Sequence, residues 1–291
     1  MNSKDYTKTE VLIIGAGPAG LASAIKLKCI SPNTEICVVE KAFEPGNHNL
    51  SGAVLEPTPI ISLLDQAAPD WRNTEEADKI LGSKIVHDDI LFLLTSKFKF
   101  NISFAITFAK KLKLGFGQMA HKGDYTVSVS ELTRWLAEIA KEKGVEVLNS
   151  FAAEDIIYDR QKQIVTGVKF VDQGLDKEAN KQPNYLPGEI ITSDVVVLAE
   201  GCDGLLTEKL VEKAELKRQS PQLYSVGVKE IIKVTPEQYQ KFGKNRVVHA
   251  MGFPIWTPVL GPSIFGGGII YPGRDDHLAV GMIVGADWKY C

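Results

Sequence analysis

The stretch from residue 11 to residue 41 constrains this chain more than any other part of its sequence. An apolar run, Val11–Ile14, breaks into the glycine-rich turn Gly15–Gly20, and a helical pattern follows. A second apolar run, Ile36–Val39, then ends on Glu40 and Lys41. Strand, glycine turn, helix, strand and acidic residue form the order that a dinucleotide-binding fold requires. The sequence therefore predicts that nucleotide phosphates bind at the start of the helix.

Each glycine of this turn has its own predicted role. Gly15 allows a tight turn, Gly17 lets the backbone approach a pyrophosphate, and Gly20 lets the helix pack close to the strand. The free N–H groups and the positive dipole end of the helix then face the phosphates. Glu40 is placed to accept hydrogen bonds from a ribose diol.

A Gly, Ser and Asn-rich stretch follows the second strand, over residues 45–53. Such a composition suits an extended segment lying along a long cofactor such as FAD, whereas an NAD-binding domain more often continues into another helix and strand. An ordinary solvated loop is the alternative interpretation of the same residues.

Composition and charge narrow the class of protein. The 291 residues, 44% of them hydrophobic and 24% charged, suffice for one large or two medium globular domains. A net charge of −3 gives no reason to expect a nucleic-acid partner. The N-terminal residues 1–10 are polar, with no signal or transit pattern, which indicates a protein that is cytosolic or bound to a membrane from the cytosolic side.

The cysteine and histidine patterns predict no metal site in this chain. The cysteines are widely separated and form no CxxC pair, which argues against a disulfide framework, a zinc site or an iron–sulfur cluster and favours a reducing compartment. They are Cys29, Cys37, Cys202 and Cys291. The histidines show no ligand spacing, and no nucleophile–base pair is evident. If the chain is an enzyme, its reaction belongs to a cofactor, and we predict no catalytic side chain.

A second glycine turn, Glu200–Gly204, follows the apolar run Val195–Ala199. We expect a buried parallel strand here, and ligands bind at the carboxyl ends of such strands; a hairpin turn is the alternative. Arg134, near the start of a helix predicted from residue 128 to 143, can reach a pyrophosphate, or it forms a surface salt bridge. Cys202 is predicted to fill the core rather than to act as a redox thiol.

The predicted fold class is α/β, with a Rossmann-like FAD-binding domain and a second, β-rich domain. The first domain is expected over residues 1–205, with an inserted apolar and basic segment at 56–117, and the second over 206–291. Residues 69–82 are expected to form a loop. Residues 90–94 form a solid apolar run, and residues 98–104 alternate apolar and polar positions. Several lysines lie around them, so the region 90–117 indicates either a half-buried hairpin or an apolar surface on an anionic bilayer.

Taken together, the first turn and Val39–Lys41 resemble the glutathione-reductase-like FAD enzymes. Four further segments, in this order and spacing, resemble the electron-transfer flavoprotein–ubiquinone oxidoreductases: Gly46–Ala53, Tyr125–Ser128, Ala199–Cys202 and Tyr224–Glu230. The resemblance continues through residues 248–254, 265–267 and 280–285 and so covers nearly the whole chain.

The resemblance implies bound FAD, reduced electron-transfer flavoprotein as electron donor, ubiquinone as acceptor, and peripheral contact with the cytoplasmic side of a bacterial inner membrane. Gly266 and Gly267 are the residues it suggests for the quinone, and it favours the membrane interpretation of residues 90–117. The residues that it implies for FAD are Gly15, Gly17, Gly20, Glu40, Lys41, Ser51, Gly52, Arg134, Gly201 and Asp203.

The sequence also departs from that family. Family members are about twice as long, and their later half carries a second FAD-contacting segment and cysteine ligands for a [4Fe–4S] cluster, neither of which this chain contains. We therefore expect an N-terminal portion whose second, β-rich domain is a truncated quinone or substrate domain, and which does not complete electron transfer alone. A stand-alone FAD enzyme of the aromatic hydroxylase or geranylgeranyl reductase kind, and a non-catalytic flavoprotein fragment, are the alternatives.

Overall fold

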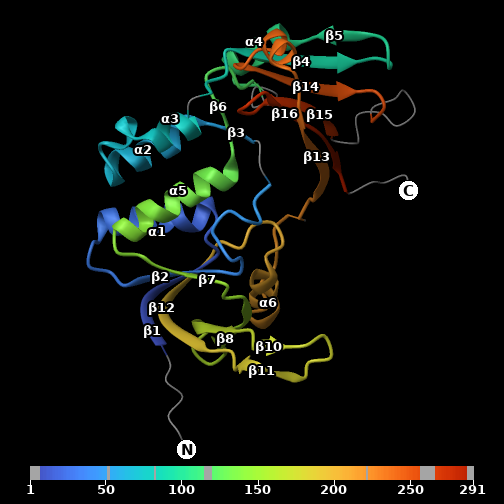
Figure 1. The fold of residues 1–291 in the computed structure, drawn as a ribbon. Helices are drawn as coiled ribbons and strands as arrows, with labels where there is room; N and C mark the ends of the chain where they lie inside the picture. The colour runs from blue at the N-terminus through green and yellow to red at the C-terminus, as the bar shows by residue number, and fades with distance from the viewer. Residues whose placement is uncertain are drawn as a thin grey trace, which may run out of the picture. The chain divides into compact units, whose positions relative to one another are not determined.

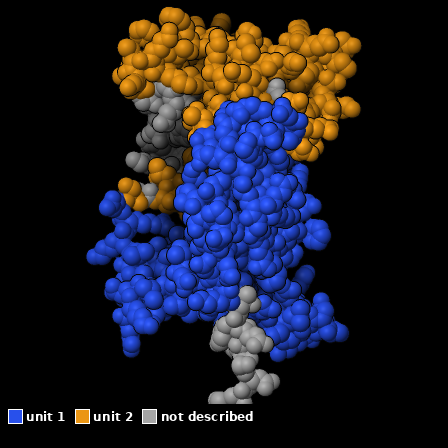
Figure 2. Space-filling view, turned by 90° about the vertical axis from the view of Figure 1, so that its left-hand side faces the viewer, with its two compact units in different colours: residues 1–51, 61–74, 129–219 blue, residues 52–60, 75–128, 220–291 orange. Residues whose placement is uncertain are grey.

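A computed structural model describes residues 7–50, 53–81, 83–114, 120–220, 222–255 and 266–286 (Figure 1). The chain forms two compact units, coloured separately in Figure 2. Unit 1 comprises residues 1–51, 61–74 and 129–219, and unit 2 comprises residues 52–60, 75–128 and 220–291. This grouping places most of the segment 56–117 with the C-terminal residues, so it differs from the domain boundaries expected from the sequence, which stay a prediction.

Unit 1 is built on a six-stranded sheet with the strand order β7-β2-β1-β12-β9-β8. Neighbours among the first four strands are parallel, whereas β9 is antiparallel to β12 and β8 is antiparallel to β9. The strands are β1 (Thr7–Ile14), β2 (Ile36–Glu40), β7 (Glu146–Asn149), β8 (Ala153–Asp159), β9 (Ile164–Phe170) and β12 (Ile190–Leu198). The structure thus confirms the predicted α/β fold class.

Helices cover this sheet because its inner strands are apolar on both faces. On one face, Leu12 and Val39 belong to a buried cluster that includes Leu206 of α6 (Leu205–Lys213). α1 (Pro18–Ile30) and α5 (Val129–Glu142) pack against each other (Figure 1), and both helices contain buried residues. Strands covered on both faces have nearly continuous apolar sequences, which is the pattern seen in β1 and β2.

The strand expected at residues 194–199 is present but is longer and less buried than predicted. β12 pairs in parallel with β1 and antiparallel with β9, so it is an inner strand of the sheet. The side chain of Val195 is nevertheless 52% exposed. The expectation of a uniformly buried strand was wrong because a central position in the sheet does not ensure that a helix covers both faces at every residue.

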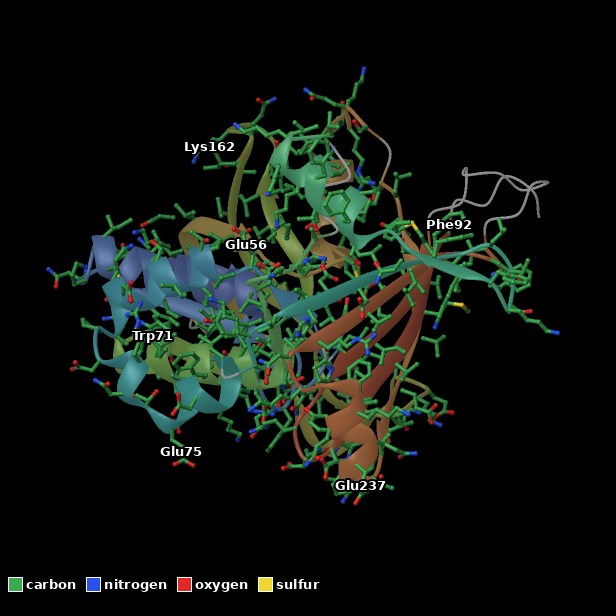
Figure 3. All side chains as sticks on the ribbon, turned by 90° about the horizontal axis from the view of Figure 1, so that it is seen from above. Glu56, Trp71, Glu75, Phe92, Lys162 and Glu237 are labelled. Carbon is green, nitrogen blue, oxygen red and sulfur yellow. The ribbon has the colours of Figure 1, made fainter. Side chains whose placement is uncertain are left out.

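Residues 69–82 were expected to form a loop, and this prediction was wrong. They contain the 3₁₀ helix η1 (Trp71–Asn73) and the helix α3 (Glu75–Leu81), and they follow α2 (Pro57–Ala67). Ala77, Ile80 and Leu81 of α3 are buried, so packing stabilises this helix. Its many charged residues had made the segment look like a solvated loop. Trp71, labelled in Figure 3, places its ring centroid 6.1 Å from that of Trp135.

Unit 2 contains a second six-stranded sheet, ordered β13-β16-β15-β14-β4-β5, in which only β4 and β14 are parallel neighbours. Its strands are β4 (His87–Leu93), β5 (Lys99–Asn101), β13 (Ser225–Lys233), β14 (Arg246–Gly252), β15 (Gly266–Pro272) and β16 (His277–Gly285). Smaller elements are the pair β3 (Ala53–Leu55) and β6 (Tyr125–Val127) in unit 2, its helices α4 (Ser103–Lys111) and α7 (Pro236–Phe242), and the hairpin β10 (Gln173–Leu175) and β11 (Lys181–Leu186) in unit 1.

The region from residue 90 to residue 114 combines the predicted hairpin with an unpredicted helix. β4 and β5 form the antiparallel hairpin. The chain then turns at Asn101, whose side-chain oxygen accepts the N–H of Ser103 at 2.9 Å, while the Ser103 hydroxyl accepts the N–H of Ile90 at 2.8 Å. These bonds end the strand and start α4, so Phe104 lies in a helix rather than a strand. Among the described residues, no helix is long and apolar enough to cross a membrane.

Candidate functional site

The turn between β1 and α1 has the geometry that its glycines predicted. Gly15 has φ +103°, and a Cβ added there would lie 2.4 Å from the carbonyl oxygen of Ala199. A Cβ on Gly20 would lie 2.0 Å from the Gly15 carbonyl oxygen, so this glycine permits the close approach of α1. A Cβ on Gly17 would meet no atom within 4 Å. Gly15 and Gly20 are therefore required by the protein itself, whereas the space beside Gly17 is open to a ligand.

Glu40 is fixed beside this turn by two backbone donors. Its Oε2 accepts the N–H of Ala16 at 3.0 Å, and its Oε1 accepts the N–H of Ala42 at 2.8 Å. An ionised carboxylate has about four acceptor positions, so two remain for other donors. The carboxylate is thus oriented by the fold and still able to accept hydrogen bonds from a ribose diol.

Asn149 supplies a second acceptor that sequence reasoning missed. It lies opposite Glu40 in the pairing of β2 with β7, at the carboxyl end of the parallel strands. Its side-chain oxygen is buried, and no described residue donates a hydrogen bond to it. The position at a strand end was the signal available in the sequence, since ligands of open α/β sheets bind at this edge.

The glycine-rich segment after β2 is held against α5. Gly46 has φ +91°, and a Cβ on it would lie 2.6 Å from the Ser130 carbonyl oxygen. Asn49 donates from Nδ2 to the Thr133 hydroxyl at 2.7 Å, and the Ser130 hydroxyl donates to the Asn49 carbonyl at 3.3 Å. The segment up to residue 50 is therefore anchored rather than freely solvated. The predicted site residues Ser51 and Gly52 lie outside the described residues.

The turn Glu200–Gly204 follows β12 at the carboxyl edge of the sheet and also provides hydrogen-bond acceptors for the start of α6. Glu200 accepts the N–H of Leu206 at 2.9 Å through Oε1, and its Oε2 accepts both the N–H and the hydroxyl of Thr207, each at 2.9 Å. The carboxylate therefore satisfies the first-turn donors of the helix. Gly201 has φ +79° and open space around it.

Cys202 and Asp203 both lie on the surface of this turn. The Cys202 thiol lies 3.8 Å from Asp203 Oδ1 and is exposed, so the prediction that it fills the core was wrong. The residue lies in the connection before α6 and not on its buried side, which begins at Leu206.

Lys41 and Arg134 are exposed, and neither forms an ion pair with another residue in the described part of the chain. The alternative of a surface salt bridge for Arg134 is therefore not realised there. Structurally, the predicted residues Gly15, Gly17, Gly20 and Glu40 come together at one turn, and the carbonyl oxygen of Ala199, just before the turn that contains Gly201, lies against Gly15. Among the described residues, no hydrogen bond or ion pair links Arg134 or Asp203 to the turn from Gly15 to Gly20.

Unit 2 contains a buried polar network that the histidine spacing did not reveal. His249 Nε2 lies 2.8 Å from the Tyr271 hydroxyl, and His249 Nδ1 lies 3.2 Å from Asp88 Oδ1. Asp88 Oδ2 accepts the backbone N–H of His121 at 2.6 Å, and His121 Nδ1 lies 3.0 Å from Asp124 Oδ2. The network joins strands β4, β14 and β15 to the residues before β6.

This arrangement shifts the pKa values of Asp88 and Tyr271. Burial opposes ionisation of Asp88, but its hydrogen bonds with His249 and His121, and the charge of each histidine, hold the pKa of its carboxyl below the ordinary value. Burial, together with the charge of Asp88, raises the pKa of Tyr271 to about 12.

Gly266 and Gly267 lie at the start of β15. A Cβ on Gly266 would lie 2.6 Å from the Ile283 carbonyl oxygen, and one on Gly267 would lie 2.2 Å from the Ala250 carbonyl oxygen. Close strand pairing therefore explains both glycines without a ligand. In the described part of the chain, no group of three or more His, Cys, Asp or Glu side chains could hold a metal ion.

Comparisons with known proteins identify one matching family model and several similar sequences. A family model described as "ETF-QO, ubiquinone-binding" matches residues 224–291. The probable mitochondrial electron transfer flavoprotein-ubiquinone oxidoreductase of Schizosaccharomyces pombe is 34% identical over 98% of this chain and 42% of its own length. The electron transfer flavoprotein-ubiquinone oxidoreductase of Pseudomonas aeruginosa is 33% identical over 97% of this chain and 48% of its own length.

Solved structures show the fold. A flavoprotein/dehydrogenase from Cytophaga hutchinsonii matches 95% of this chain and 55% of its own chain, with a TM-score of 0.58 and 17% identity. A complex of aklavinone-11 hydroxylase with FAD and aklavinone matches 99% of this chain and 47% of its own, with a TM-score of 0.59 and 16% identity.

The chain thus shares its fold with FAD-dependent enzymes and spans less than half the length of the curated relatives that it matches. Over nearly its whole length, the chain is similar to electron transfer flavoprotein-ubiquinone oxidoreductases, and its residues 224–291 match the ubiquinone-binding model of that family.

Proposed function

We propose that this chain forms the FAD-binding and quinone-facing parts of an oxidoreductase that passes electrons from reduced electron-transfer flavoprotein to ubiquinone. The observation that carries the proposal is the turn from Gly15 to Gly20 with Glu40 fixed beside it, in a chain whose relatives bear that activity in their names. When bound, FAD supplies the redox chemistry, because its ring system accepts electrons from one partner and releases them to another.

The residues present fit FAD. The open space at Gly17, which precedes the first residue of α1, leaves the helix start accessible to a pyrophosphate. Glu40 and the donor-free oxygen of Asn149 supply acceptors for ribose hydroxyls or an amino group. We propose that Lys41, Ser51, Gly52, Arg134, Gly201 and Asp203 complete the FAD site, as the family resemblance implies. The chain's own side chains bind and orient the cofactor, and none is proposed as a catalytic acid, base or nucleophile.

We also propose that unit 2 contacts a membrane peripherally, through α4. Phe104 is 85% exposed and Phe108 is 55% exposed, and the two lie one turn apart on the same side of the helix. The exposed lysines Lys111 and Lys113 follow them closely in sequence. Exposed aromatic side chains beside lysines suit the interface of an anionic bilayer, and we propose the cytoplasmic face of a bacterial inner membrane.

Gly266 and Gly267 remain candidates for the quinone region. They lie within residues 224–291, which match the ubiquinone-binding family model. Their structural role in strand pairing does not exclude a contact from their backbone, because a glycine lets another molecule approach the strand closely.

A reconstitution experiment tests the proposed function. The purified chain is incubated with FAD, passed over a gel-filtration column, and examined for flavin absorbance at about 450 nm. Flavin that co-elutes with the protein, and that is lost in the variant Glu40→Leu, supports the FAD site.

The FAD-loaded chain is then mixed with reduced electron-transfer flavoprotein and decylubiquinone, and quinol formation is followed. Co-elution of FAD without quinol formation would limit the proposal to FAD binding. A chain that folds, as judged by circular dichroism, but retains no FAD would contradict the proposal.

A further inference from the structure

β13 has an unusual distribution of exposed and buried residues. It is an edge strand of the second sheet, and among its nine residues only Lys229 is not exposed. The apolar residues beside it are exposed instead, with Val226 at 65% and Val228 at 74%. A strand that shields its lysine and exposes its valines reverses the usual distribution, so Lys229 requires an explanation.

The neighbours of Lys229 define the surface on which it lies. Lys229 pairs with Gly281 across β13 and β16, and Gly281 pairs with Ile269 across β16 and β15. A Cβ on Gly281 would lie 3.3 Å from Lys229 Cβ and 3.3 Å from Ile269 Cγ1, so all three residues share one face of the sheet. Ile269 packs against the buried cluster that contains Tyr271 and Val247. Lys229 therefore lies on the face that buries the core of unit 2.

The ammonium group of Lys229 has no acceptor among the described residues. Its Nζ is buried, and none of their oxygen atoms accepts a hydrogen bond from it. Burial without a partner lowers the pKa of Lys229. An unpaired buried charge is costly, because the group has lost its hydration without gaining a partner. A ligand that brings an acceptor to this place would therefore relieve the cost of the unpaired charge.

We infer that Lys229 donates a hydrogen bond from its ammonium group to a carbonyl oxygen of ubiquinone. This inference rests on the proposed function. Lys229 lies within residues 224–291, the part that matches the ubiquinone-binding family model. Gly281 beside it carries no side chain, and Ile269 is an apolar neighbour that is only partly buried. A quinone has an apolar ring, which suits the apolar neighbours, and carbonyl oxygens, which can accept a hydrogen bond from Lys229.

Binding of decylubiquinone to the full chain tests the inference, with Kd measured from the quenching of tryptophan fluorescence. Lys229→Met keeps the length of the side chain and removes its donors, while Lys229→Gln keeps an uncharged N–H donor. Lys233→Met is the matched control, since Lys233 is an exposed lysine on the same strand. We expect Lys229→Met to weaken binding roughly 10- to 100-fold, Lys229→Gln to weaken it less, and Lys233→Met to leave it unchanged.

Thermal unfolding without quinone provides a second measurement. Because Lys229→Met replaces an unpaired buried charge by an apolar group, we expect it to raise the Tm of the free chain. Unchanged affinity in a folded Lys229→Met variant would overturn the inference and leave the proposed function standing. A Tm that falls as far in Lys229→Gln as in Lys229→Met, with equal loss of affinity in both, would show a structural role and overturn it too. A wild-type chain that binds no decylubiquinone would overturn the proposed quinone function and this inference with it.

Discussion

The Nε2 atom of His249 lies 2.8 Å from the hydroxyl oxygen of Tyr271, which joins the neighbouring strands β14 and β15 inside unit 2. The same imidazole contacts Asp88 through its other nitrogen, so three strands share one chain of hydrogen bonds. Buried polar networks stabilise a fold when every member is satisfied and destabilise it when one partner is removed. The first two predictions therefore concern this network.

Replacing Asp88 by Asn should destabilise the chain by about 1–3 kcal/mol, because the charge-assisted contact with His249 and the bond from His121 are weakened. The pKa of Asp88 is lowered in the folded state. Its contribution to stability is therefore fully present above the unfolded value of about 3.9 and is lost as the pH falls below it. Urea unfolding between roughly pH 3 and pH 7 should show a weaker pH dependence for Asp88→Asn.

Asp194→Asn is the control for that experiment, since Asp194 is exposed and forms only a 3.7 Å surface pair with Lys8. This variant should keep the wild-type stability and pH dependence. Equal behaviour of the two variants would show that the Asp88 network does not contribute to folding stability.

Replacing Tyr271 by Phe should remove a phenol that ionises late. The pKa of Tyr271 is raised to about 12 in the folded state. Its stability contribution is therefore present below the unfolded value of about 10 and is lost as the pH rises through the folded value. Absorbance near 295 nm, followed between about pH 9 and pH 12, should show a late component in the wild type that Tyr271→Phe lacks. A late component that persists in Tyr271→Phe would assign it to another tyrosine.

The three described cysteines should differ in reactivity. Cys202 is exposed, whereas burial, together with the charge of Glu146, raises the pKa of Cys37 to about 12. Because only thiolates react, an aromatic disulfide reagent at about pH 8 should modify Cys202 quickly and Cys37 only on unfolding. In a Cys291→Ser background, Cys202→Ser should remove the fastest phase and Cys37→Ser should leave the kinetics unchanged. A fast phase lost in Cys37→Ser would contradict the burial of that thiol.

Alanine substitutions in the first glycine turn should separate folding from cofactor binding. Gly15→Ala places a Cβ 2.4 Å from the Ala199 carbonyl in a left-handed conformation, so we expect a loss of at least about 2 kcal/mol in stability. Gly17→Ala meets no protein atom within 4 Å, so it should fold with nearly wild-type stability and still lose FAD affinity. Thermal unfolding and FAD titration together check this contrast. Wild-type FAD affinity in Gly17→Ala would place the pyrophosphate elsewhere.

The proposed membrane contact predicts that polar substitutions on α4 release the chain from lipid. The double variant Phe104→Ser and Phe108→Ser should bind anionic vesicles at least about tenfold more weakly than the wild type, because two exposed aromatic anchors are lost. Its stability should change little, since α4 contains no buried residue. Phe43→Ser, which removes an exposed phenylalanine of unit 1, is the control. Sedimentation with vesicles measures binding, and equal binding of all three proteins would remove α4 as the contact.

The sequence predicts local structure well where one segment contains the whole signal. The run from Val11 to Glu40 contains its own strands, turn, helix and acid, and the structure places each as expected. α3 escaped prediction because it is only seven residues long and its polar composition is typical of a loop, whereas the burial of Ala77, Ile80 and Leu81 became visible only in the structure. Likewise, the period-two pattern through Phe104 did not show that the side chains of Asn101 and Ser103 would turn the strand into α4.

Site residues held together by long-range contacts could not be predicted. Asp88 and His249 are separated by 161 positions, and no spacing rule connects them. Asn149 becomes notable only because β7 pairs with β2 and brings it beside Glu40. From the sequence, Lys229 looks like an ordinary surface lysine. Only its pairing with Gly281 shows that it lies on the buried face of the sheet. In each case, strand order determined the neighbourhood.

The exposed edge of β13 has a practical consequence for anyone who purifies this chain. Its outer side presents backbone N–H and C=O groups that no described strand pairs with, flanked by the bare side chains of Val226 and Val228. Such an edge is a template on which a second copy can add a strand, and growth from one copy to the next leads to aggregates. A charged side chain in place of Val228 is therefore expected to reduce association between copies of the purified chain.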